Sequence, residues 1–375
     1  MAMKSMEELD RPGRRRFIGT CMAGVATWHF GVPVARAATP EASFALTSDM
    51  QADALRASVP EKVAASLVRK ARESLSRASH VMPVVHTQGL LPHQGNRDES
   101  VLAQEDWRDT IVQALAWRLS GDEAHLARAT AYVRDWLAVY RPSFDPIDET
   151  EVATWICGFD LVQSRLAPET VAAMRGFGRA LADGYSAVPH RVGDHSTGLN
   201  NWQSHRIKLA AAGAFVSGDA ARVAAARERF FAHVDSNIRD DGSTYDFAQR
   251  DALHYVVYTL EPMLVAASMA AAHGEDWYGA ARSGAKLARA LAWLQPYALG
   301  EKQHEEFVHS SVPFDQRRAA AGVKGFSGPW QPKAASVVYH IAAQLDTAFI
   351  PVSEALTPAP PQVQALYSRR FARSA

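Results

Sequence analysis

Apolar residues recur along most of the chain at the three- and four-residue intervals of amphipathic helices, whereas the alternation typical of strands is scarce. Trp107, Ile111, Leu115 and Leu119, for example, follow one another at intervals of four. The same periodicity predicts helices over residues 60–77, 100–119, 123–140, 202–216, 221–238, 250–272 and 277–294. We therefore expect an all-α protein.

Short breaks between these ranges have the composition of tight helix–helix turns. Ser120-Gly121-Asp122 and Ser217-Gly218-Asp219 place a glycine, which can take the left-handed conformation that ends a helix, before an aspartate that can cap the next. His273-Gly274-Glu275-Asp276 is a third such break. Antiparallel hairpins must bury their apolar faces on one another, and a ring of hairpins achieves this for a chain of 375 residues. The predicted fold is an incomplete α/α toroid; an open solenoid, the alternative, needs a stricter repeat.

Composition excludes several classes of protein. Hydrophobic residues make up 47% of the chain, which is ample for a buried core and excludes disorder for most of its length. The 40 Lys and Arg residues are balanced by 40 Asp and Glu residues, so the basic excess typical of nucleic-acid binding is missing. Two cysteines are too few for a disulfide scaffold or a four-cysteine metal site. We expect no nucleic-acid partner.

Residues 1–37 have the features of an export signal. Arg14-Arg15-Arg16-Phe17 is a twin-arginine pattern, and a weakly apolar run follows it. Val34-Ala35-Arg36-Ala37 then provides the small residues that signal peptidase requires, which places cleavage after Ala37. An ordinary basic N-terminal arm is the alternative.

Cleavage would leave Cys157 as the only cysteine, which suits twin-arginine export of a protein that has already folded in a reducing compartment. Residues 38–357 are then expected to form the toroid domain and residues 358–375 a flexible tail. No later apolar stretch has the length of a membrane span. We expect the mature protein to be periplasmic or secreted and not attached to a membrane.

The long predicted connections are residues 81–99, 141–150, 188–200 and 295–331, and loops of this length commonly carry function. Polar residues gather in the segments 86–98, 200–206 and 300–307, in or beside these connections, and in 250–258 on a predicted helix. Asn201 and His205 are four residues apart and would share a helical face. On a continuous helix over 250–272, Arg250 and His254 would share a face, as would Asp251, Tyr255 and Tyr258. Each residue alone has a structural explanation, such as a helix cap for Asn200 or a core aromatic for a tyrosine.

Together these side chains form a set with a chemical use. Asparagine and arginine can neutralise a carboxylate, while histidine and tyrosine can move protons. That set suits β-elimination from a uronic acid, in which neutralising the C6 carboxylate acidifies the C5 proton, a base removes it, and an acid protonates the departing O4. Trp202 offers a surface on which a sugar ring could stack.

Metal-dependent and hydrolytic chemistry fit the pattern less well. His304-Glu305-Glu306-Phe307-Val308-His309 is similar to the zinc-binding helix of metalloproteases, but its second histidine comes five residues after the first rather than four. Glu105-Asp106 and Asp148-Glu149-Thr150-Glu151 offer carboxylates to a hydrolase, although acidic pairs are usually solvated turns or caps. We expect neither a metal nor a cofactor.

Several separated motifs occur in one order between about residues 80 and 345. They are His86-Thr87-x-Gly89-x-Leu91-Pro92-x-Gln94-Gly95-x-Arg97-Asp98, Ala114-Leu115-Ala116-Trp117-Arg118-Leu119-x-Gly121-Asp122, Pro146-Ile147-Asp148-Glu149-Thr150, Asn200-Asn201-Trp202 and Leu253-x-Tyr255-x-x-Tyr258-x-Leu260. In this order they resemble the alginate lyase superfamily of α/α-toroid polysaccharide lyases. The resemblance implies metal-free β-elimination on a polyuronate.

The resemblance also implies roles for individual residues. Asn201 would neutralise the substrate carboxylate with help from Arg250, and Tyr255 would protonate the leaving oxygen, with Tyr258 as its substitute. The alginate lyases carry a histidine directly after the two asparagines, where this chain has Trp202. Either His205, one turn further on, or a tyrosine would then be the base. The spacing from Arg250 to Tyr255 is also shorter than in that family, and both differences suggest a sister family that acts on glucuronan.

The catalytic candidates are therefore Asn201, His205, Arg250, Tyr255 and Tyr258. The candidates for substrate binding are His86, Gln94, Arg97, Trp202, Arg206, His254, Lys302 and His304. Because the expected substrate is a polyanion, we expect the positive charges of Arg97, Arg206, Arg250 and Lys302 to converge on one cleft.

The predicted function is that of an exported lyase that cleaves a polyuronate, most simply alginate at mannuronate-type linkages. The alternatives are a glucuronan lyase of the same fold, an inverting glycoside hydrolase and a non-catalytic polysaccharide-binding protein. Mannuronate and glucuronate hold the C5 proton and O4 on the same side, so one tyrosine can be both base and acid. Guluronate, the C5 epimer, needs a base and an acid on opposite faces, such as a Tyr–His pair.

Overall fold

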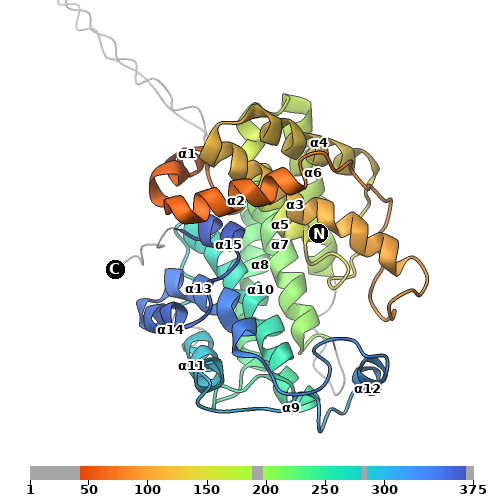
Figure 1. The fold of residues 1–375 in the computed structure, drawn as a ribbon, viewed down its shortest axis with the longest axis vertical. Helices are drawn as coiled ribbons and strands as arrows, with labels where there is room; N and C mark the ends of the chain where they lie inside the picture. Colours follow the sequence, from red (N-terminus) through yellow and green to blue (C-terminus); the bar gives the residue numbers. More distant parts are fainter. Residues whose placement is uncertain (1–42, 188–196, 281–284, 369–375) are drawn as a thin grey trace, which may run out of the picture. The chain divides into compact units, whose positions relative to one another are not determined.

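The computed structural model describes residues 43–187, 197–280 and 285–368 (Figure 1). The expected export signal over residues 1–37 lies outside these ranges, as does most of the predicted connection 188–200. The described ranges are helical and contain no strand. Their β pairing is limited to two isolated bridges, Ile238–Thr244 and Glu305–Pro329.

The helices form an inner and an outer layer, and the chain alternates between the two over α3 to α10. Their bounds are α1 Asp49–Ser58, α2 Glu61–Glu73, α3 Arg97–Ser120, α4 Glu123–Val139, α5 Val152–Val162, α6 Pro168–Ala187, α7 Asn201–Ser217, α8 Ala220–Asn237, α9 Tyr245–Arg250, α10 Leu253–Ala272, α11 Lys286–Ala298, α12 Pro313–Ala320, α13 Ser336–Leu345, α14 Ile350–Ala355 and α15 Pro361–Leu366. Short 3-10 turns precede α6, α13 and α14.

The inner layer is an arc of packed helices. α3 packs on α5, α5 on α7, α7 on α10, and α10 on α13. α15 contacts α13 at one end of this arc and α2 and α3 at the other. The helices α4, α6 and α8 each pack outside the inner helix that precedes or follows them in the chain. This arrangement is the predicted incomplete α/α toroid of antiparallel hairpins.

Two of the predicted turns form as expected. Gly121 and Gly218 both have positive φ, 77° and 71°, and end α3 and α7 in the left-handed conformation. Asp122 then accepts a hydrogen bond from the amide of Ala124, and Asp219 caps α8 in the same way. Local sequence therefore determines these hairpins, because glycine and aspartate meet needs that arise within one turn of the chain.

Other predicted elements differ from the structure. The third break is not followed by a helix at residue 277, because Trp277 to Ala280 are irregular and α11 begins only at Lys286. α5 was not predicted because nearly all of its residues are apolar, so no face stands out. α6 was not predicted either, and it contains three glycines, which disfavour a helix in isolation.

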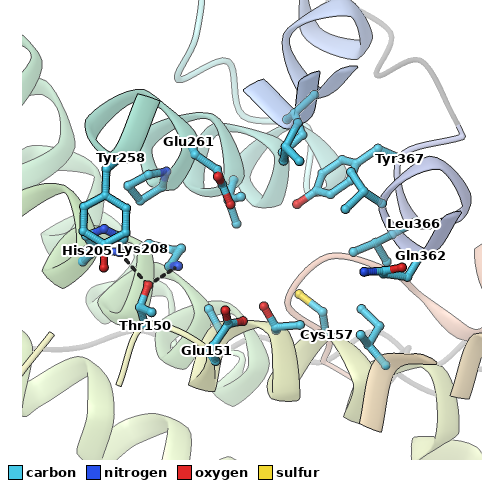
Figure 2. A pocket seen from close by; sticks show the side chains of 18 residues that line it. Thr150, Glu151, Cys157, His205, Lys208, Tyr258, Glu261, Gln362, Leu366 and Tyr367 are labelled. Atoms are coloured by element: carbon cyan, nitrogen blue, oxygen red, sulfur yellow. Dashed lines mark hydrogen bonds between the residues drawn. The ribbon is translucent and has the colours of Figure 1, made fainter. Parts of the chain in front are cut away.

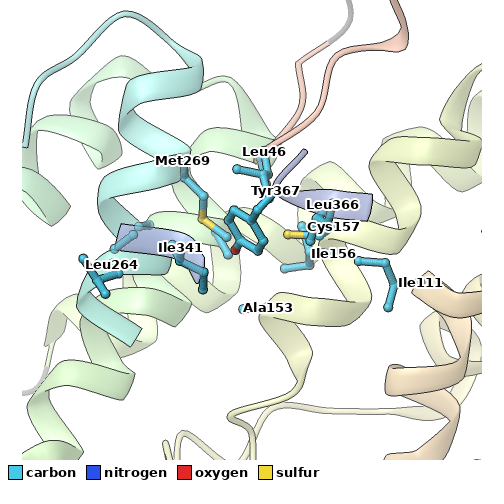
Figure 3. Packing of buried hydrophobic residues seen from close by; sticks show 14 of the residues in the cluster. Leu46, Ile111, Ala153, Ile156, Cys157, Leu264, Met269, Ile341, Leu366 and Tyr367 are labelled. Atoms are coloured by element: carbon cyan, nitrogen blue, oxygen red, sulfur yellow. The ribbon is translucent and has the colours of Figure 1, made fainter. Parts of the chain in front are cut away.

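The expectation of a flexible tail from residue 358 is wrong as far as residue 368. Residues Pro361–Leu366 form α15, and Leu366 and Tyr367 are buried. Figure 3 shows the Tyr367 ring between Met269 and Cys157, with Leu46 above it. The C-terminal segment thus belongs to the core as a short plug. Its helix has only six residues, too few to show helical periodicity in the sequence. Residues 369–375 lie outside the described ranges.

α10 also departs from expectation, since it is long and apolar enough to cross a membrane by composition alone. It packs against both α7 and α13, and most of its residues are buried inside the fold. Its apolar character is therefore that of a central core helix.

Two glycines allow α6 and α7 to pack closely. A Cβ added at Gly213 of α7 would lie 2.4 Å from the carbonyl oxygen of Gly178, and one added at Gly178 would lie 2.6 Å from a methyl of Val216. Gly178 of α6 and Gly213 of α7 thus have a packing reason. Their contact helps to set the distance of α6 from α7, whose first turn carries Asn201.

We predict that Gly213→Ala lowers the free energy of unfolding by about 1–3 kcal/mol, because the new methyl group forces two backbones apart. The matched control is Gly176→Ala on α6, where the nearest atom to the added Cβ is 3.7 Å away. That variant should be neutral or gain up to about 1 kcal/mol from helix propensity. Denaturant unfolding of both variants tests this, and equal stabilities would contradict the proposed close contact.

Candidate active site

A cleft of about 270 Å³ lies where the first turns of α7 and α10 face α12 and the loops around it. Its walls are formed by Gln88, Ile147, Asn201, Trp202, Arg250, His254, Tyr255, Tyr258, Phe314, Arg318 and Phe326. The polar groups in this set are two guanidiniums, two phenols, one imidazole and two amides. None of the lining side chains is a carboxylate.

The start of α7 places Asn201 in the cleft. Asn200 is the helix cap, since its side chain accepts a hydrogen bond from the amide of Trp202 at 3.1 Å. Asn201 is almost fully buried, and its Nδ2 and backbone N both donate to the same oxygen of Asp246, at 2.7 and 3.0 Å. Because a carboxylate only accepts, this contact fixes which way the amide points. One hydrogen of Nδ2 bonds Asp246, and the second is left for a ligand.

The continuous helix predicted over 250–272 is wrong. α9 ends at Arg250, Asp251 takes a left-handed conformation with φ 49°, and α10 begins at Leu253. Arg250 therefore does not share a helical face with His254. The break instead folds the arginine back over α10, with its guanidinium carbon 3.8 Å from the centroid of the Tyr255 ring.

Glu306 supplies the cap that α10 lacks in its own sequence. The N-cap residue Ala252 has no polar side chain, and Glu306 accepts hydrogen bonds from the amides of Leu253 and His254 at 3.0 and 3.2 Å. Burial raises the pKa of Glu306 to about 8, against the opposing effect of these amide bonds. A residue from the connection after α11 thus holds the turn that carries His254 and Tyr255.

A second arginine, absent from the predicted candidates, completes the site. Arg318 of α12 donates from Nη1 to the Tyr255 hydroxyl at 3.1 Å. Asp315 is buried beneath both guanidiniums, 2.8 Å from Nη1 of Arg250 and 3.6 Å from Nη1 of Arg318. Arg318 lies in the long connection 295–331 that the sequence marks as a functional loop, but its separation of 63 residues from Tyr255 concealed the contact.

The two arginines affect the pKa values of Tyr255 and Tyr258 differently. Burial raises the pKa of Tyr255, while the charges of Arg250 and Arg318 and the hydrogen bond from Arg318 lower it. Burial raises the pKa of Tyr258 far above its ordinary value, and the neighbouring Tyr255 adds to the rise. The pKa of both phenols is raised on balance, but the arginines oppose the rise more at Tyr255, which is therefore the more easily ionised of the two. Burial, followed by the charges of Arg318 and Arg250, lowers the pKa of His254 to about 4, so this imidazole is neutral at physiological pH.

The carboxylates considered for a hydrolase serve as structural acceptors. Asp148 is buried and accepts from Nδ1 of His86 at 2.9 Å and from the amides of Thr87 and Gln88 at 2.7 Å, which places Gln88 in the cleft wall. Glu149 is buried and accepts from the Tyr140 hydroxyl at 2.6 Å. Glycoside hydrolysis with inversion requires two carboxyl groups that flank the substrate, and neither of these faces the cleft.

Asp106 and Glu105 are also outside the cleft wall. Asp106 is buried and accepts from the indole nitrogen of Trp136 at 2.9 Å and from the amide of His80 at 2.7 Å. Glu151 lines a separate interior cavity.

The predicted convergence of four cations is wrong for three of them, since Arg250 alone of the four lines the cleft. Arg206 is buried beneath Trp202 and donates to the carbonyl of Thr197 at 2.9 Å. Lys302 is exposed over the Tyr297 ring, and Arg97 faces its neighbour Asp98. The positive charge of the site comes instead from Arg250 of α9 and Arg318 of α12, which both pair with Asp315.

Four further candidates also lie outside the cleft wall. His86 lies behind Gln88, on Asp148, and Gln94 accepts from the amide of Leu91 in an exposed turn. His304 bonds the carbonyl oxygen of Asp251 at 3.0 Å and so supports the break between α9 and α10. His205 is buried behind Tyr258, with ring centroids 4.2 Å apart, and faces the interior cavity. The remaining candidates, Asn201, Trp202, Arg250, His254, Tyr255 and Tyr258, do line the cleft together.

Comparisons with known proteins agree with this architecture. The sequence profile described as "Alginate lyase" matches residues 49–304. An alginate lyase from Bacteroides ovatus superposes with a TM-score of 0.65 at 14% identity, over 87% of this chain and 99% of its own. Alginate lyase A1-III from Sphingomonas species A1 gives a TM-score of 0.54 at 15% identity, over 84% and 98%. No curated protein matches the sequence significantly.

A histidine-to-alanine variant of alginate lyase A1-III complexed with a tetrasaccharide is also similar, with a TM-score of 0.53. At these identities the superpositions establish the fold, and the profile, which spans more than half of the chain, establishes the family. The protein therefore belongs to the alginate lyase family and is a polysaccharide lyase.

Proposed function

We propose that this enzyme cleaves a polyuronate, in the first place alginate at mannuronate-type linkages, by a β-elimination that needs no metal. The observation that carries the proposal is the chemistry of the cleft wall, where two arginines converge on one tyrosine and carboxylates are missing from the lining residues. Such a wall attracts an anionic sugar. It also offers a phenolate as a base, and it lacks the acid pair of a hydrolase.

The reaction can be written with the groups at hand. The C6 carboxylate of the bound uronate is neutralised by the free N–H of Asn201 and by the arginines, which acidifies the C5 proton. The Tyr255 phenolate takes that proton, and the electrons of the C5–H bond form the C4=C5 double bond as the C4–O4 bond breaks. Tyr255 then gives the same proton to O4, which restores the phenolate. Trp202 offers a face on which a neighbouring sugar ring stacks.

The role of Tyr255 limits the substrate. A single tyrosine reaches the C5 proton and O4 from one side, so it serves mannuronate and glucuronate but not guluronate. The similar alginate lyase A1-III forms a complex with a tetrasaccharide, which supports a saccharide substrate for this chain. Glucuronan is the alternative polymer for this chain, because glucuronate differs from mannuronate only at C2.

Incubation of the purified protein with polymannuronate, polyguluronate and glucuronan, each in the presence of EDTA, tests the proposal. We expect ultraviolet absorbance to rise with polymannuronate, because each cleavage creates a conjugated C4=C5 double bond. A rise with glucuronan instead would name the alternative substrate. New reducing ends without absorbance would contradict elimination, and loss of activity in EDTA would contradict a metal-free reaction.

Tyr255→Phe is the control for this experiment, because it removes only the hydroxyl that moves the proton. Turnover should fall by at least about 10³-fold while binding of the polymer persists. Tyr258→Phe should cost less if Tyr255 is the base. The reverse order of the two variants would transfer the role to Tyr258.

Arg318 and Arg317 form a matched pair of neighbouring charges on α12. Arg318 lines the cleft and bonds Tyr255, whereas Arg317 is exposed beside Phe314. We expect Arg318→Ala to lower kcat/KM by about 10²-fold, since it removes stabilisation of the phenolate and of the substrate charge. Arg317→Ala, which removes the same formal charge, should stay within about two-fold. If both variants lost the same amount of kcat/KM in steady-state kinetics, the total positive charge of α12 and not the contact of Arg318 with Tyr255 would determine the activity.

We further propose that the protein is exported by the twin-arginine route. The support is the order of the features in residues 1–37 and the single buried thiol, Cys157, of the remaining chain. The double variant Arg14→Lys/Arg15→Lys should keep the protein in the cytoplasm, because that route reads the arginine pair. Cell fractionation and N-terminal sequencing measure this, and an exported protein that does not begin at Ala38 would contradict the cleavage site.

A further inference from the structure

A second cavity lies behind the active site, in the interior of the helical ring. It has a volume of about 270 Å³ and shares one residue with the cleft, Tyr258, which forms part of both walls. Figure 2 shows His205, Thr150 and Lys208 at one end of this cavity, next to Tyr258. The reaction proposed above does not use these three residues.

The three residues form a hydrogen-bonded chain. Lys208 Nζ lies 2.8 Å from Thr150 Oγ1, and the same oxygen lies 2.7 Å from Nδ1 of His205. Both contacts are drawn as dashed lines in Figure 2. Within the described residues, Thr150 Oγ1 makes no other hydrogen bond.

The direction of each bond follows from what each group can do. An ammonium group has hydrogens but no lone pair, so Lys208 donates and Thr150 accepts. The hydroxyl hydrogen of Thr150 then has one acceptor within reach, Nδ1 of His205. If Nδ1 of His205 carried a proton, that proton would point at the hydroxyl hydrogen of Thr150. The buried hydroxyl would then have no acceptor for its own hydrogen. The chain therefore places the proton of the imidazole on Nε2.

The charges around the imidazole favour the same state. Lys208 lies one turn away on α7, while Tyr258 and Glu261 face the cavity from α10. Cys157 faces it from α5, and Glu151 faces it from the residue just before α5. Burial lowers the pKa of His205 well below its ordinary value, and the charge of Lys208 adds to this. Burial also lowers the pKa of Lys208, but Glu151 and Glu261 oppose that change and favour its ammonium form.

We propose that Lys208 and Thr150 are positioning residues that hold His205 as a neutral imidazole protonated on Nε2, so that it cannot accept a proton beside Tyr258. The inference rests on the proposed elimination and deepens it. Nε2 of His205 is buried, the backbone of Tyr258 lies within hydrogen-bonding reach of the imidazole, and the ring packs against that of Tyr258 with centroids 4.2 Å apart. His205 then has a packing role, and base and acid fall to tyrosine alone, which confines the enzyme to uronates whose C5 proton and O4 lie on one side.

The test is the protonation pattern of the His205 ring nitrogens, read by ¹⁵N NMR of the imidazole, because it is independent of turnover. In the wild-type protein we expect Nδ1 to have the shift of a nitrogen without hydrogen and Nε2 that of a protonated one, unchanged between about pH 5 and 8. A signal assigned to a protonated Nδ1, or one that titrates in this range, would overturn the proposal.

Two matched pairs of variants connect this pattern to activity. Thr150→Val removes the hydroxyl without changing the shape, whereas Thr150→Ser keeps it. Lys208→Met removes the buried ammonium, whereas Lys62→Met removes an exposed one on α2. Thr150→Val and Lys208→Met should mix the two tautomers of His205 but leave kcat and KM within about two-fold, because the imidazole takes no part in the proton transfer and neither residue lines the cleft. Thr150→Ser and Lys62→Met should keep the wild-type pattern and rate.

Retention of the wild-type tautomer in both Thr150→Val and Lys208→Met would overturn the role of the chain. If these variants do not fold, the wild-type spectrum still decides which nitrogen carries the proton. Cleavage of polyguluronate by the wild-type enzyme would overturn the inference that tyrosine acts alone. Failure of the elimination itself is a separate result, since it would appear as missing absorbance with every polymer while the NMR pattern stands.

Discussion

The active site depends on one buried carboxylate, that of Asp246. It accepts hydrogen bonds from both nitrogens of Asn201, from the amide of Asn237 and from the hydroxyl of Thr259. These partners lie at the start of α7, at the end of α8 and within α10, so one side chain ties three helices of the ring together where the cleft opens. A buried carboxylate with this many donors is stable only while all of them are present. The position of Asn201 is therefore a property of the whole ring.

A second carboxylate, Asp315, organises the positive side of the cleft. It lies beneath Arg250 and Arg318, which reach it from α9 and α12, and both guanidiniums then meet at Tyr255. The chain as a whole carries as many acidic as basic groups, so attraction of a polyanion must come from this local pairing. The same two charges stabilise a phenolate, which joins substrate binding and proton transfer in one arrangement.

The interior of the helical ring keeps one side chain, His205, from taking part in the reaction. Lys208 and Thr150 lie behind the cleft and are connected to it through His205, whose ring packs on Tyr258. Histidine is a common general base, but the environment of His205 favours its neutral form and so keeps it out of the proton transfer. Which side chains do chemistry is thus decided as much by their buried neighbours as by their own type.

The sequence by itself determined the features that arise within a few turns of chain. Helical periodicity identified most of the hairpins, Gly121 and Gly218 ended their helices as expected, and Asn201 and Tyr255 were recognised from their local motifs. Each of these depends on neighbours a few residues away, which a single sequence displays.

The tertiary structure decided what depends on contacts across the ring. The left-handed turn at Asp251 is held by His304, the cap of α10 comes from Glu306, and Arg318 reaches Tyr255 from 63 residues away. The C-terminal plug around Tyr367 likewise packs against helices from distant parts of the chain. Such contacts leave no periodic trace, because the partners are brought together only by burial of the helix faces between them.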